Sequence, residues 1–411
     1  MKKHLFVLFV CLFVVNIGFG ITLPVLTFYT ERLALEEGVS KSAISLHVGL
    51  LTSVYAVMQL VFAPLWGRIS DSVGRKPLLL LGIAGYAVAQ VLFGLASNLW
   101  LLYLARIVGG AFSAATLPAA AAYVSDRTSG KNRNRGMAWL GTAASLGVVI
   151  GPALGGLLAR RDWHFRAEIG HFVADSFSIP FFAAAALALA AVVFAIKWLP
   201  ESHFVNSNSK AAKDAKLGWR DLELRLRPLL ILAFLGQFGL ALFEAMFVLF
   251  ASARFDFGPL EVGVIFVICG LVMAVFQGLL VGYLSGRISE SRQIVAGFIL
   301  MGLSLGLMAA TKISETVFLL VGSFALGMAL IAPNLSALVS KRMDRSNTGA
   351  ALGIQSMANS LGQSGGPIVG GALFVFSVGM PFLVTGGLLL ATGLIVGWQA
   401  VFPSQIRRKF G

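Results

Sequence analysis

Charged residues and cysteines are both scarce in this chain of 411 residues. Only 12% of the residues are Asp, Glu, Lys or Arg, whereas 57% are hydrophobic, and the mean hydropathy is +0.85. A soluble protein of this length needs more charge to cover its surface. The two cysteines, Cys11 and Cys269, lie in apolar stretches, so we expect neither a disulfide nor a metal site. The composition therefore predicts a membrane protein.

Motifs for enzymatic chemistry are also missing. The sequence contains no P-loop and no His/Asp/Glu spacing typical of a metal site. We therefore expect no enzyme, no cofactor and no direct use of ATP. A channel should show a filter or a ring of pore residues, and none is recognisable. The formal net charge of +14 could suggest nucleic acid, but the basic residues lie in short loops between apolar stretches, so no nucleic-acid partner is expected.

Twelve apolar stretches are long enough to cross a bilayer, which takes about 20 residues. We interpret the first as a span and not as a cleaved signal peptide, because it continues through Pro24 to Phe28 without an A-x-A-like site. The fold class is therefore all-α, with twelve transmembrane helices. The predicted spans are residues 4–29, 44–66, 77–97, 99–124, 136–159, 179–199, 228–253, 259–284, 293–311, 315–339, 349–375 and 380–402.

Lysine and arginine are distributed unevenly between the two sets of loops. One set holds only Arg32, Lys41, Arg160, Arg161, Arg166, Arg254 and Lys312, while both termini and the alternate loops hold nearly all the others. The positive-inside rule therefore predicts that both termini are cytoplasmic, in a cytoplasmic (inner) membrane. The loop of residues 160–178, which also carries His164, His171 and Asp175, is predicted to be a solvated external segment.

The chain also repeats itself at a fixed offset of 215 residues. In a membrane protein such a repeat predicts two similarly folded halves that rock about a central site, which indicates transport. We place the halves at residues 1–199 and 228–411, joined by a polar cytoplasmic linker at 200–227. The matching positions are Gly67 with Gly282, Pro118 with Pro333, Ser145-Leu146-Gly147 with Ser360-Leu361-Gly362, Gly151-Pro152 with Gly366-Pro367, and Gly155-Gly156 with Gly370-Gly371.

Between the second and third spans lies the segment Gly67-Arg-Ile-Ser-Asp71-Ser-Val-Gly74-Arg75-Lys76-Pro77. Asp71 in a tight loop can accept backbone N–H groups and face a helix N-terminus, and Gly74 allows a sharp turn. The alternative is a generic basic turn. The second half has a reduced copy, Gly282-Tyr-Leu-Ser-Gly286-Arg287, in which Gly286 replaces the aspartate, so the two halves should differ here.

Two further segments carry unusual residues inside spans. Arg106 lies in Leu102 to Gly110, and a guanidinium in the bilayer should face a partner or a water-filled cavity, unless it merely reaches the interface. The fifth span contains Gly147, Gly151, Pro152, Gly155 and Gly156. Because proline kinks a helix and glycine allows close packing, this helix suits a seal between moving halves, the alternative being an ordinary packing kink.

In this order, on twelve spans, the three motifs resemble the loop signature, the fourth-helix arginine motif and the fifth-helix antiporter motif of the major facilitator superfamily. The stretch from His47 to Pro64 is similar to tetracycline exporters, whereas Phe238 to Glu244 and Gly362 to Pro367 look more like Gram-positive-type multidrug exporters. The drug:proton antiporter branch fits best. The resemblance implies two pseudo-symmetric six-helix bundles, a proton as coupling ion, a small amphipathic substrate, contact with membrane lipid and a monomer.

The chain departs from these families at three positions. Tetracycline exporters carry acids in spans one and three, where this sequence has Val15 and Ala89, and the multidrug exporters carry a second acid where it has Ala329. Neither tetracycline export by the usual residues nor coupling through two acids is therefore expected.

Glu244 is the only acidic residue that we place well inside a span. Removal from water favours the neutral form of a carboxyl group, which suits Glu244 to bind and release a proton. We predict that Glu244 and Arg106 couple proton entry to export of lipophilic or amphipathic compounds; a carboxyl neutralised by a polar neighbour is the alternative. Export of an endogenous lipid or metabolite is the alternative function. Candidate cavity residues, each equally suited to bridging helices, are Asn16, Gln59, Gln237, Gln355 and Asn359.

Overall fold

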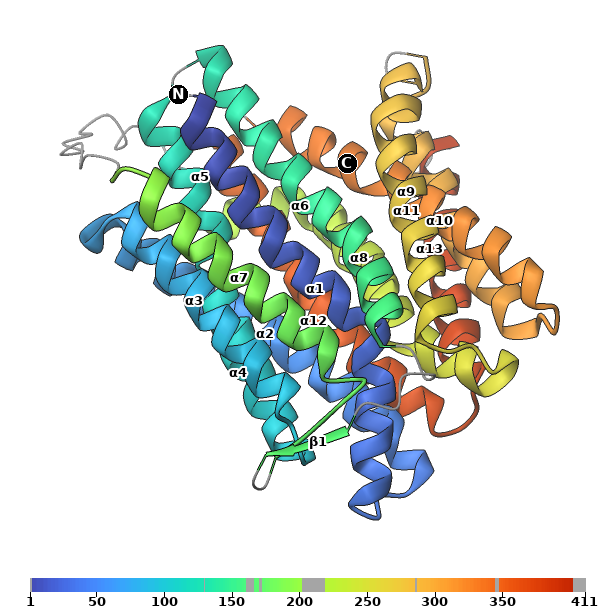
Figure 1. The fold of residues 1–411 in the computed structure, drawn as a ribbon. Coiled ribbons are helices and arrows are strands. Elements are labelled where there is room, and N and C mark those ends of the chain that lie inside the picture. Colours follow the sequence, from blue (N-terminus) through green and yellow to red (C-terminus); the bar gives the residue numbers. More distant parts are fainter. Residues whose placement is uncertain are drawn as a thin grey trace. The chain divides into compact units, whose positions relative to one another are not determined.

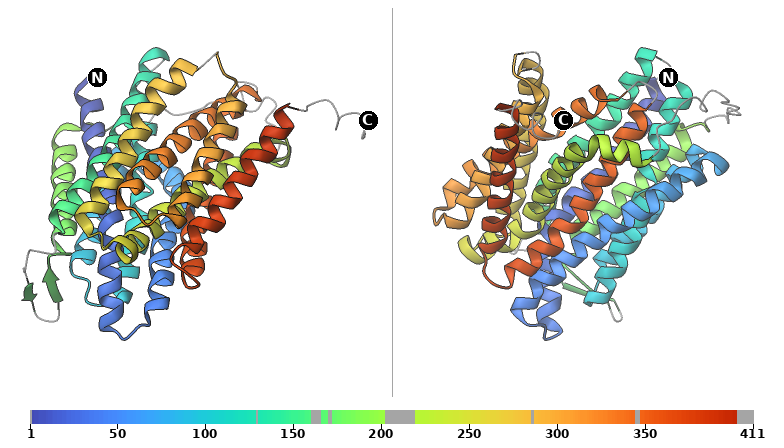
Figure 2. Two further views of the ribbon diagram at one scale, coloured as in Figure 1. Left: turned by 90° about the vertical axis from the view of Figure 1, so that its right-hand side faces the viewer. Right: turned by 180° about the vertical axis from the view of Figure 1, so that it is seen from behind.

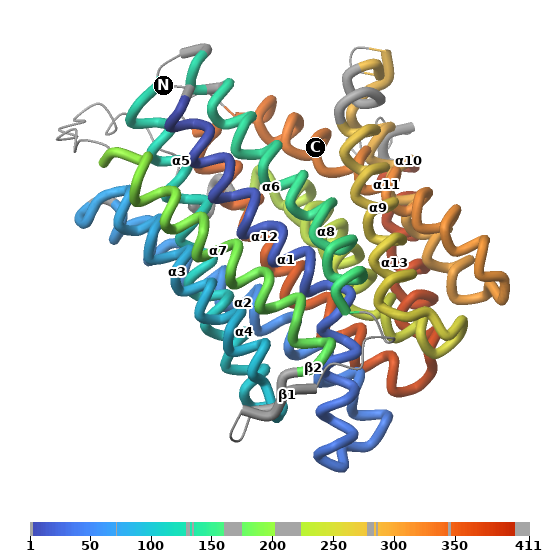
Figure 3. Tube along the Cα trace, viewed as in Figure 1, coloured from blue at the N-terminus to red at the C-terminus, as the bar shows by residue number. Residues whose placement is uncertain are grey.

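The computed structural model describes residues 2–128, 130–159, 166–169, 172–201, 219–284, 287–343 and 347–401 (Figure 3). Helices account for nearly all of these residues (Figure 1). In chain order the elements are α1 (Lys2–Glu36), α2 (Lys41–Val73), α3 (Arg75–Gly94), α4 (Leu99–Ser113), α5 (Thr116–Arg127), α6 (Gly130–Leu158), β1 (Arg166–Ile169), β2 (Phe172–Asp175), α7 (Ile179–Trp198), α8 (Trp219–Phe255), α9 (Pro259–Leu284), α10 (Glu290–Ala310), α11 (Ser314–Lys341), α12 (Thr348–Phe374) and α13 (Met380–Val401).

All twelve predicted spans fall on helices, and α4 and α5 together form the fourth. Among the described residues, eleven helical segments are long and apolar enough to cross a membrane. The other predicted span is α12, which is 27 residues long but carries Gln355, Asn359 and Gln363 among its glycines and serines. These polar side chains make α12 less apolar without interrupting the helix, so the all-α fold of twelve spans is confirmed.

The chain forms two compact units. The first comprises Met1–Lys210 with Ala251–Val267, and the second comprises Ala211–Phe250 with Ile268–Gly411. In the first unit α1 packs against α6 and α7, α3 against α4 and α7, and α2 against α4 (Figure 1). In the second unit α10 packs against both α11 and α13 (Figure 2). Residues 202–218 of the predicted linker lie outside the described residues, so the division at 200–227 stays a prediction.

Each unit buries its own apolar core and exposes other large apolar side chains. Leu8, Ile83 and Ala188 are fully buried in the first unit, as are Phe298 and Phe324 in the second. On the outside, Trp100, Val193, Leu319 and Trp398 are each more than half exposed. Apolar surface on this scale would promote association in water, whereas the hydrocarbon core of a bilayer accommodates it.

The α4 helix, which carries Arg106, has a well-defined start. The side chain of Asn98 accepts a hydrogen bond from the Leu101 N–H at 2.9 Å, as an N-cap does. The carboxylate of Glu37, just beyond α1, accepts a second bond from the Leu99 N–H at 2.7 Å. The Asn98 cap fixes where α4 begins, and the Glu37 bond anchors α4 to the end of α1.

The segment after α6 contains a β-hairpin, where the sequence indicated a solvated loop. Strands β1 and β2 pair antiparallel, with Arg166 opposite Asp175 and Ile169 opposite Phe172. The Asp175 carboxylate accepts hydrogen bonds from the Phe177 N–H at 2.9 Å and the Ser178 N–H at 3.2 Å, and it forms an ion pair with Arg32 of α1. The expectation of a freely solvated segment is therefore wrong for Asp175. Arg160, Arg161, His164 and His171 lie outside the described residues.

Candidate functional site

Arg106 is buried among aromatic side chains in the first unit. Only 4% of the residue is exposed, and its guanidinium carbon lies 5.3 Å from the ring centre of Tyr55 (α2) and 5.4 Å from that of Phe93 (α3). Within the described part of the chain no carboxylate pairs with it, and its Nε is buried without a hydrogen-bond partner. An arginine that merely reaches the membrane interface does not fit this burial.

Glutamine and tyrosine side chains extend this polar region across the neighbouring helices. The Gln59 amide donates to the Tyr55 hydroxyl at 3.3 Å and to Ser113 Oγ at 3.2 Å. The Gln90 amide on α3 donates to the Tyr86 hydroxyl and to the backbone oxygen of Gly18 on α1 at 3.5 Å. We call Tyr55, Gln59, Tyr86, Gln90, Phe93 and Arg106 the arginine cluster.

The arginine cluster combines a buried positive charge, aromatic faces and unused hydrogen-bonding capacity. Contact with aromatic faces offsets only part of the cost of burying a guanidinium, and a carboxylate partner is missing from the described residues. Gln90 Oε1 is likewise buried without a partner in this part of the chain. Unpaired buried polar atoms mark positions where water, an ion or a ligand can complete the bonding. The cluster can therefore bind acceptor atoms beside a flat aromatic surface.

Glu244 lies in α8 of the second unit and is half-buried, between the buried residues Phe243 and Ala245. Its carboxyl group forms no hydrogen bond or ion pair with any described residue. The Cys269 thiol on α9 lies within electrostatic range of it. The Phe243 ring also contacts Phe324, with 4.6 Å between ring centres. A partly accessible carboxyl with no hydrogen-bond or ion-pair partner among the described residues can bind a proton or a cation.

The other predicted cavity residues differ in their bonding. Asn16 donates to the Leu12 carbonyl oxygen of its own helix at 2.8 Å, whereas Gln355 is buried and donates to Ser336 Oγ on α11 at 3.1 Å. Gln237 and Asn359 are half-buried and form no hydrogen bond with any described residue. Gln59 and Gln355 therefore bridge helices, while Gln237 and Asn359 keep their amides available.

Glycines of α6 bring this helix into backbone contact with α1. A Cβ atom placed on these glycines would collide with carbonyl oxygens of α1, so only glycine permits the approach. The distances would be 2.7 Å from Gly147 to Phe13, 2.5 Å from Gly151 to Ile17 and 2.5 Å from Gly155 to Ile21.

The two remaining residues of this motif make different contacts. Pro152 Cδ packs against Gly20 of α1. Gly156 lies against the backbone of Pro259, a residue of the same compact unit, and a Cβ there would come within 2.5 Å of the Pro259 oxygen.

Glycines of α12 repeat the contact on α8 in the second unit. A Cβ at Gly362 or Gly366 would collide with the carbonyl oxygens of Phe234 or Phe238. Phe234 and Phe238 lie 221 positions after Phe13 and Ile17, their counterparts in α1. The offset between the equivalent glycines of α6 and α12 is 215, so the two offsets differ by six residues. Asn16 is thereby equivalent to Gln237, since their Cβ atoms face Gly147 and Gly362 respectively.

The turn between α2 and α3 consists of one residue, Gly74, whose φ of +111° favours glycine. Because α2 continues to Val73, Asp71 lies in its last turn and not in a loop, which corrects the sequence prediction; the Asp71 side chain lies outside what the structure describes. A carboxylate does face the N-terminus of α3, and it belongs to Glu201. Its carboxylate accepts bonds from the Arg75 N–H at 3.1 Å and the Lys76 N–H at 3.3 Å.

The side chains of Arg75 and Lys76 tie α3 to its neighbours. Arg75 Nε lies 3.0 Å from Asp126 Oδ2 at the end of α5, and Arg75 Nη1 donates to Ser70 Oγ of α2 at 2.9 Å. Lys76 Nζ donates to the Ile196 carbonyl oxygen of α7 at 3.1 Å. A Cβ at Gly67 would meet nothing within 4 Å, and Gly286 lies outside the described residues.

Sequence reasoning missed three residues that the structure brings into these sites. Tyr86 lies one helical turn before Gln90 and bonds to it, a spacing that could have indicated the pair. Asp126 has a charged counterpart, Lys341, at the repeat offset of 215 residues, and this correspondence could have indicated Asp126. For Glu201 no signal was available beyond a charge directly after Pro200, because its partners are 126 and 125 residues away in sequence.

Comparison with known proteins extends over nearly the whole chain. A family model described as Major Facilitator Superfamily matches residues 8–311 and 255–404. Multidrug resistance protein 2 of Bacillus subtilis (strain 168) is 31% identical over 411 residues, covering 97% of this chain and 96% of its own length. Tetracycline resistance protein, class E, of Escherichia coli is 30% identical over 374 residues, covering 90% and 87%.

Solved structures share the fold at lower identity. The human organic anion transporter MFSD10 (TETRAN) superimposes with a TM-score of 0.68 at 23% identity, covering 96% of this chain and 99% of its own. A bacterial homolog to the human lysosomal transporter Spinster, in an inward-facing and occupied conformation, gives a TM-score of 0.73 at 14% identity, covering 99% and 96%. At these identities the likeness concerns the fold alone.

Proposed function

Because this chain belongs to the Major Facilitator Superfamily, we propose that it is a proton-coupled exporter of lipophilic or amphipathic compounds in the cell membrane. The names of its relatives support this proposal, since they include multidrug and tetracycline resistance proteins that match nearly the whole chain. Transport proceeds by alternating access, in which the two repeated halves change their relative orientation.

The half-buried carboxyl of Glu244, without a hydrogen-bond or ion-pair partner among the described residues, is the observation that carries proton coupling. An ionised carboxyl in apolar surroundings is costly unless it is paired, so it binds a proton or a cationic substrate. Proton and substrate then compete for the same group, and competition of this kind is what an antiporter requires.

Arg106 supplies the second charged group. Its buried positive charge, held against the rings of Tyr55 and Phe93, disfavours cations near the arginine cluster. Gln237 and Asn359 add amides that have no bond within the described residues.

Efflux from proteoliposomes tests this function. A fluorescent cationic dye is loaded, and its release is followed with and without an imposed proton gradient. We expect gradient-dependent efflux from the native protein and at least tenfold less from Glu244→Gln, with Glu315→Gln, at an exposed position in the first turn of α11, as the matched control. Full efflux by Glu244→Gln would exclude the proposed coupling, and transport of a labelled phospholipid without any dye would favour lipid export.

We also propose that both termini are cytoplasmic, because lysine and arginine are concentrated on their side of the membrane. Both native cysteines are buried, so single exposed cysteines can report sidedness. A membrane-impermeant maleimide added to intact cells should label Ser40→Cys, between α1 and α2, but not Ser72→Cys at the other end of α2. The reverse pattern would invert the topology.

A further inference from the structure

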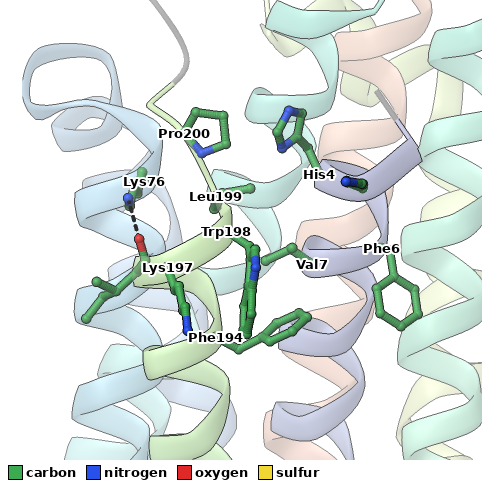
Figure 4. A pocket seen from close by; sticks show the side chains of 11 residues that line it. His4, Phe6, Val7, Lys76, Phe194, Lys197, Trp198, Leu199 and Pro200 are labelled. Atoms are coloured by element: carbon green, nitrogen blue, oxygen red, sulfur yellow. Dashed lines mark hydrogen bonds between the residues drawn. The ribbon is translucent and has the colours of Figure 1, made fainter.

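A cavity of about 650 Å³ opens where the N-terminal part of α1 meets the end of α7 and the start of α3 (Figure 4). It lies wholly within the first unit. Its volume is within the range of about 300–1,000 Å³ that is common for small-molecule sites. It is separate from the arginine cluster and from Glu244, since none of those residues lines it.

The polar lining of this cavity is basic. Lys3, Lys76 and Lys197 contribute ammonium groups, and His4 contributes an imidazole, whereas none of the described residues that line it is an aspartate or glutamate. The nearby carboxylate of Glu201 already accepts the N–H groups at the start of α3. Nδ1 of His4 is buried without a hydrogen-bond partner in the described part of the chain. The described lining is therefore positively charged and suited to a negatively charged group.

The apolar lining of the cavity faces the outside of the helices. Phe6 on α1 is 55% exposed and Trp198 on α7 is 48% exposed. The ring centres of Phe194 and Trp198 are 4.4 Å apart, and Lys197 Nζ lies 5.1 Å from the centre of the Trp198 ring. Exposed aromatic rings beside lysines at the end of a membrane helix are typical of the bilayer interface.

We propose that this cavity binds the phosphate headgroup of an anionic phospholipid, with an acyl chain lying along Phe6, Phe194 and Trp198. Lys3 and Lys197 contact the phosphate oxygens, and Lys76 stays bonded to the Ile196 carbonyl, as Figure 4 shows. Exposed aromatic surface beside the charges distinguishes a lipid from free phosphate, which would gain nothing from it. Basic pockets between membrane helices recognise anionic headgroups in this way. With the termini in the cytoplasm, as proposed above, the lipid belongs to the inner leaflet.

Fluorescence quenching tests binding independently of transport. The protein is placed in phosphatidylcholine nanodiscs, and phosphatidylglycerol with brominated acyl chains is added in steps. Because the chain has seven tryptophans, the difference between native protein and Trp198→Phe isolates the signal of Trp198. We expect this signal to be quenched at phosphatidylglycerol fractions at least about tenfold lower in native protein than in the double variant Lys3→Gln/Lys197→Gln.

Two controls decide the outcome. Lys41 is an exposed lysine at the start of α2, the end farther from the cavity, so Lys41→Gln should bind like the native protein. Brominated phosphatidylcholine should show no preference for the site. The proposal is overturned if the double variant is quenched as readily as the native protein. It is also overturned if inorganic phosphate prevents quenching as effectively as unlabelled phosphatidylglycerol does, because the site would then recognise free phosphate.

Discussion

Arg75 on α3 and Asp126 on α5 form an ion pair in which Nε and Oδ2 are 3.0 Å apart. The residues 215 positions later, Glu290 and Lys341, also form an ion pair, between α10 and α11. The two pairs join equivalent helices in the two halves with opposite polarity. The second copy of the loop motif, in which Gly286 replaces Asp71, is thus not simply reduced, because its ion pair persists with the charges exchanged.

Giving the first pair the polarity of the second tests what this contact does. Arg75→Glu places a negative charge beside Asp126 and near Glu201, so we expect transport to fall at least fivefold. Adding Asp126→Lys restores an attractive pair and should recover at least half of the lost transport. Dye efflux from proteoliposomes measures both variants.

The second pair provides the comparison. Lys341 has 64% of its side chain exposed, and exposed ion pairs contribute about 0–1 kcal/mol. Glu290→Lys should therefore reduce transport less than Arg75→Glu does. If the double variant Arg75→Glu/Asp126→Lys is as defective as the single one, the charges themselves do not explain the contact.

Glycine packing predicts which α6 positions tolerate a methyl group. At Gly151 an added Cβ would lie 2.5 Å from the Ile17 oxygen, whereas at Gly141 it would meet nothing within 4 Å. Gly151→Ala should lose about 1–3 kcal/mol of stability through overpacking, and Gly141→Ala should be neutral or slightly stabilising. Thermal unfolding in detergent compares the two, and equal melting temperatures would contradict the close contact of α1 with α6.

The same comparison applies to the second unit. Gly366→Ala collides with Phe238 of α8, while Gly353→Ala on the same helix meets open space. A similar difference in melting temperature is expected, since the helix pairs α1–α6 and α8–α12 are equivalent.

Arg106 should be required for transport but not for stability. A buried guanidinium without a carboxylate partner within the described residues carries an uncompensated desolvation cost. Arg106→Gln therefore should abolish efflux while leaving the melting temperature unchanged or raised. Arg292→Gln, at an exposed position on α10, should alter neither quantity. A melting temperature that drops by many degrees in Arg106→Gln would indicate a structural role instead.

Asp175 should anchor the hairpin to the start of α7 and to α1. Asp175→Ala removes its pair with Arg32 and the bonds from Phe177 and Ser178. We expect a loss of about 1–2 kcal/mol and faster cleavage in the hairpin by a protease added to the purified protein. Asp175→Asn keeps an acceptor oxygen for both N–H groups and should lie between native protein and Asp175→Ala, so an equal loss in both variants would locate the effect in the ion pair alone.

The twelve spans were predictable because each lies in a largely apolar stretch of sufficient length, and membrane crossing depends on local composition. The pattern of small residues similarly indicated close packing at Gly147 and Gly151. The break between α4 and α5 at Ala114 and Ala115 carried no comparable signal, since alanine favours helix. The hairpin at Asp175 was also hidden, because Asp175 pairs with Arg32, which is distant in sequence.

Hydropathy, the internal repeat and the rare intramembrane charges of Arg106 and Glu244 were enough to predict the membrane fold, because each can be recognised from residue identities along the chain. The neighbours of Arg106 became known only from the packing of the helices. Tyr55 and Phe93 reach Arg106 from two other helices, and Glu201, just after α7, reaches the α3 N-terminus. Such contacts depend on helix rotation and register, which arise from the packing of whole helices and leave no mark in any single segment.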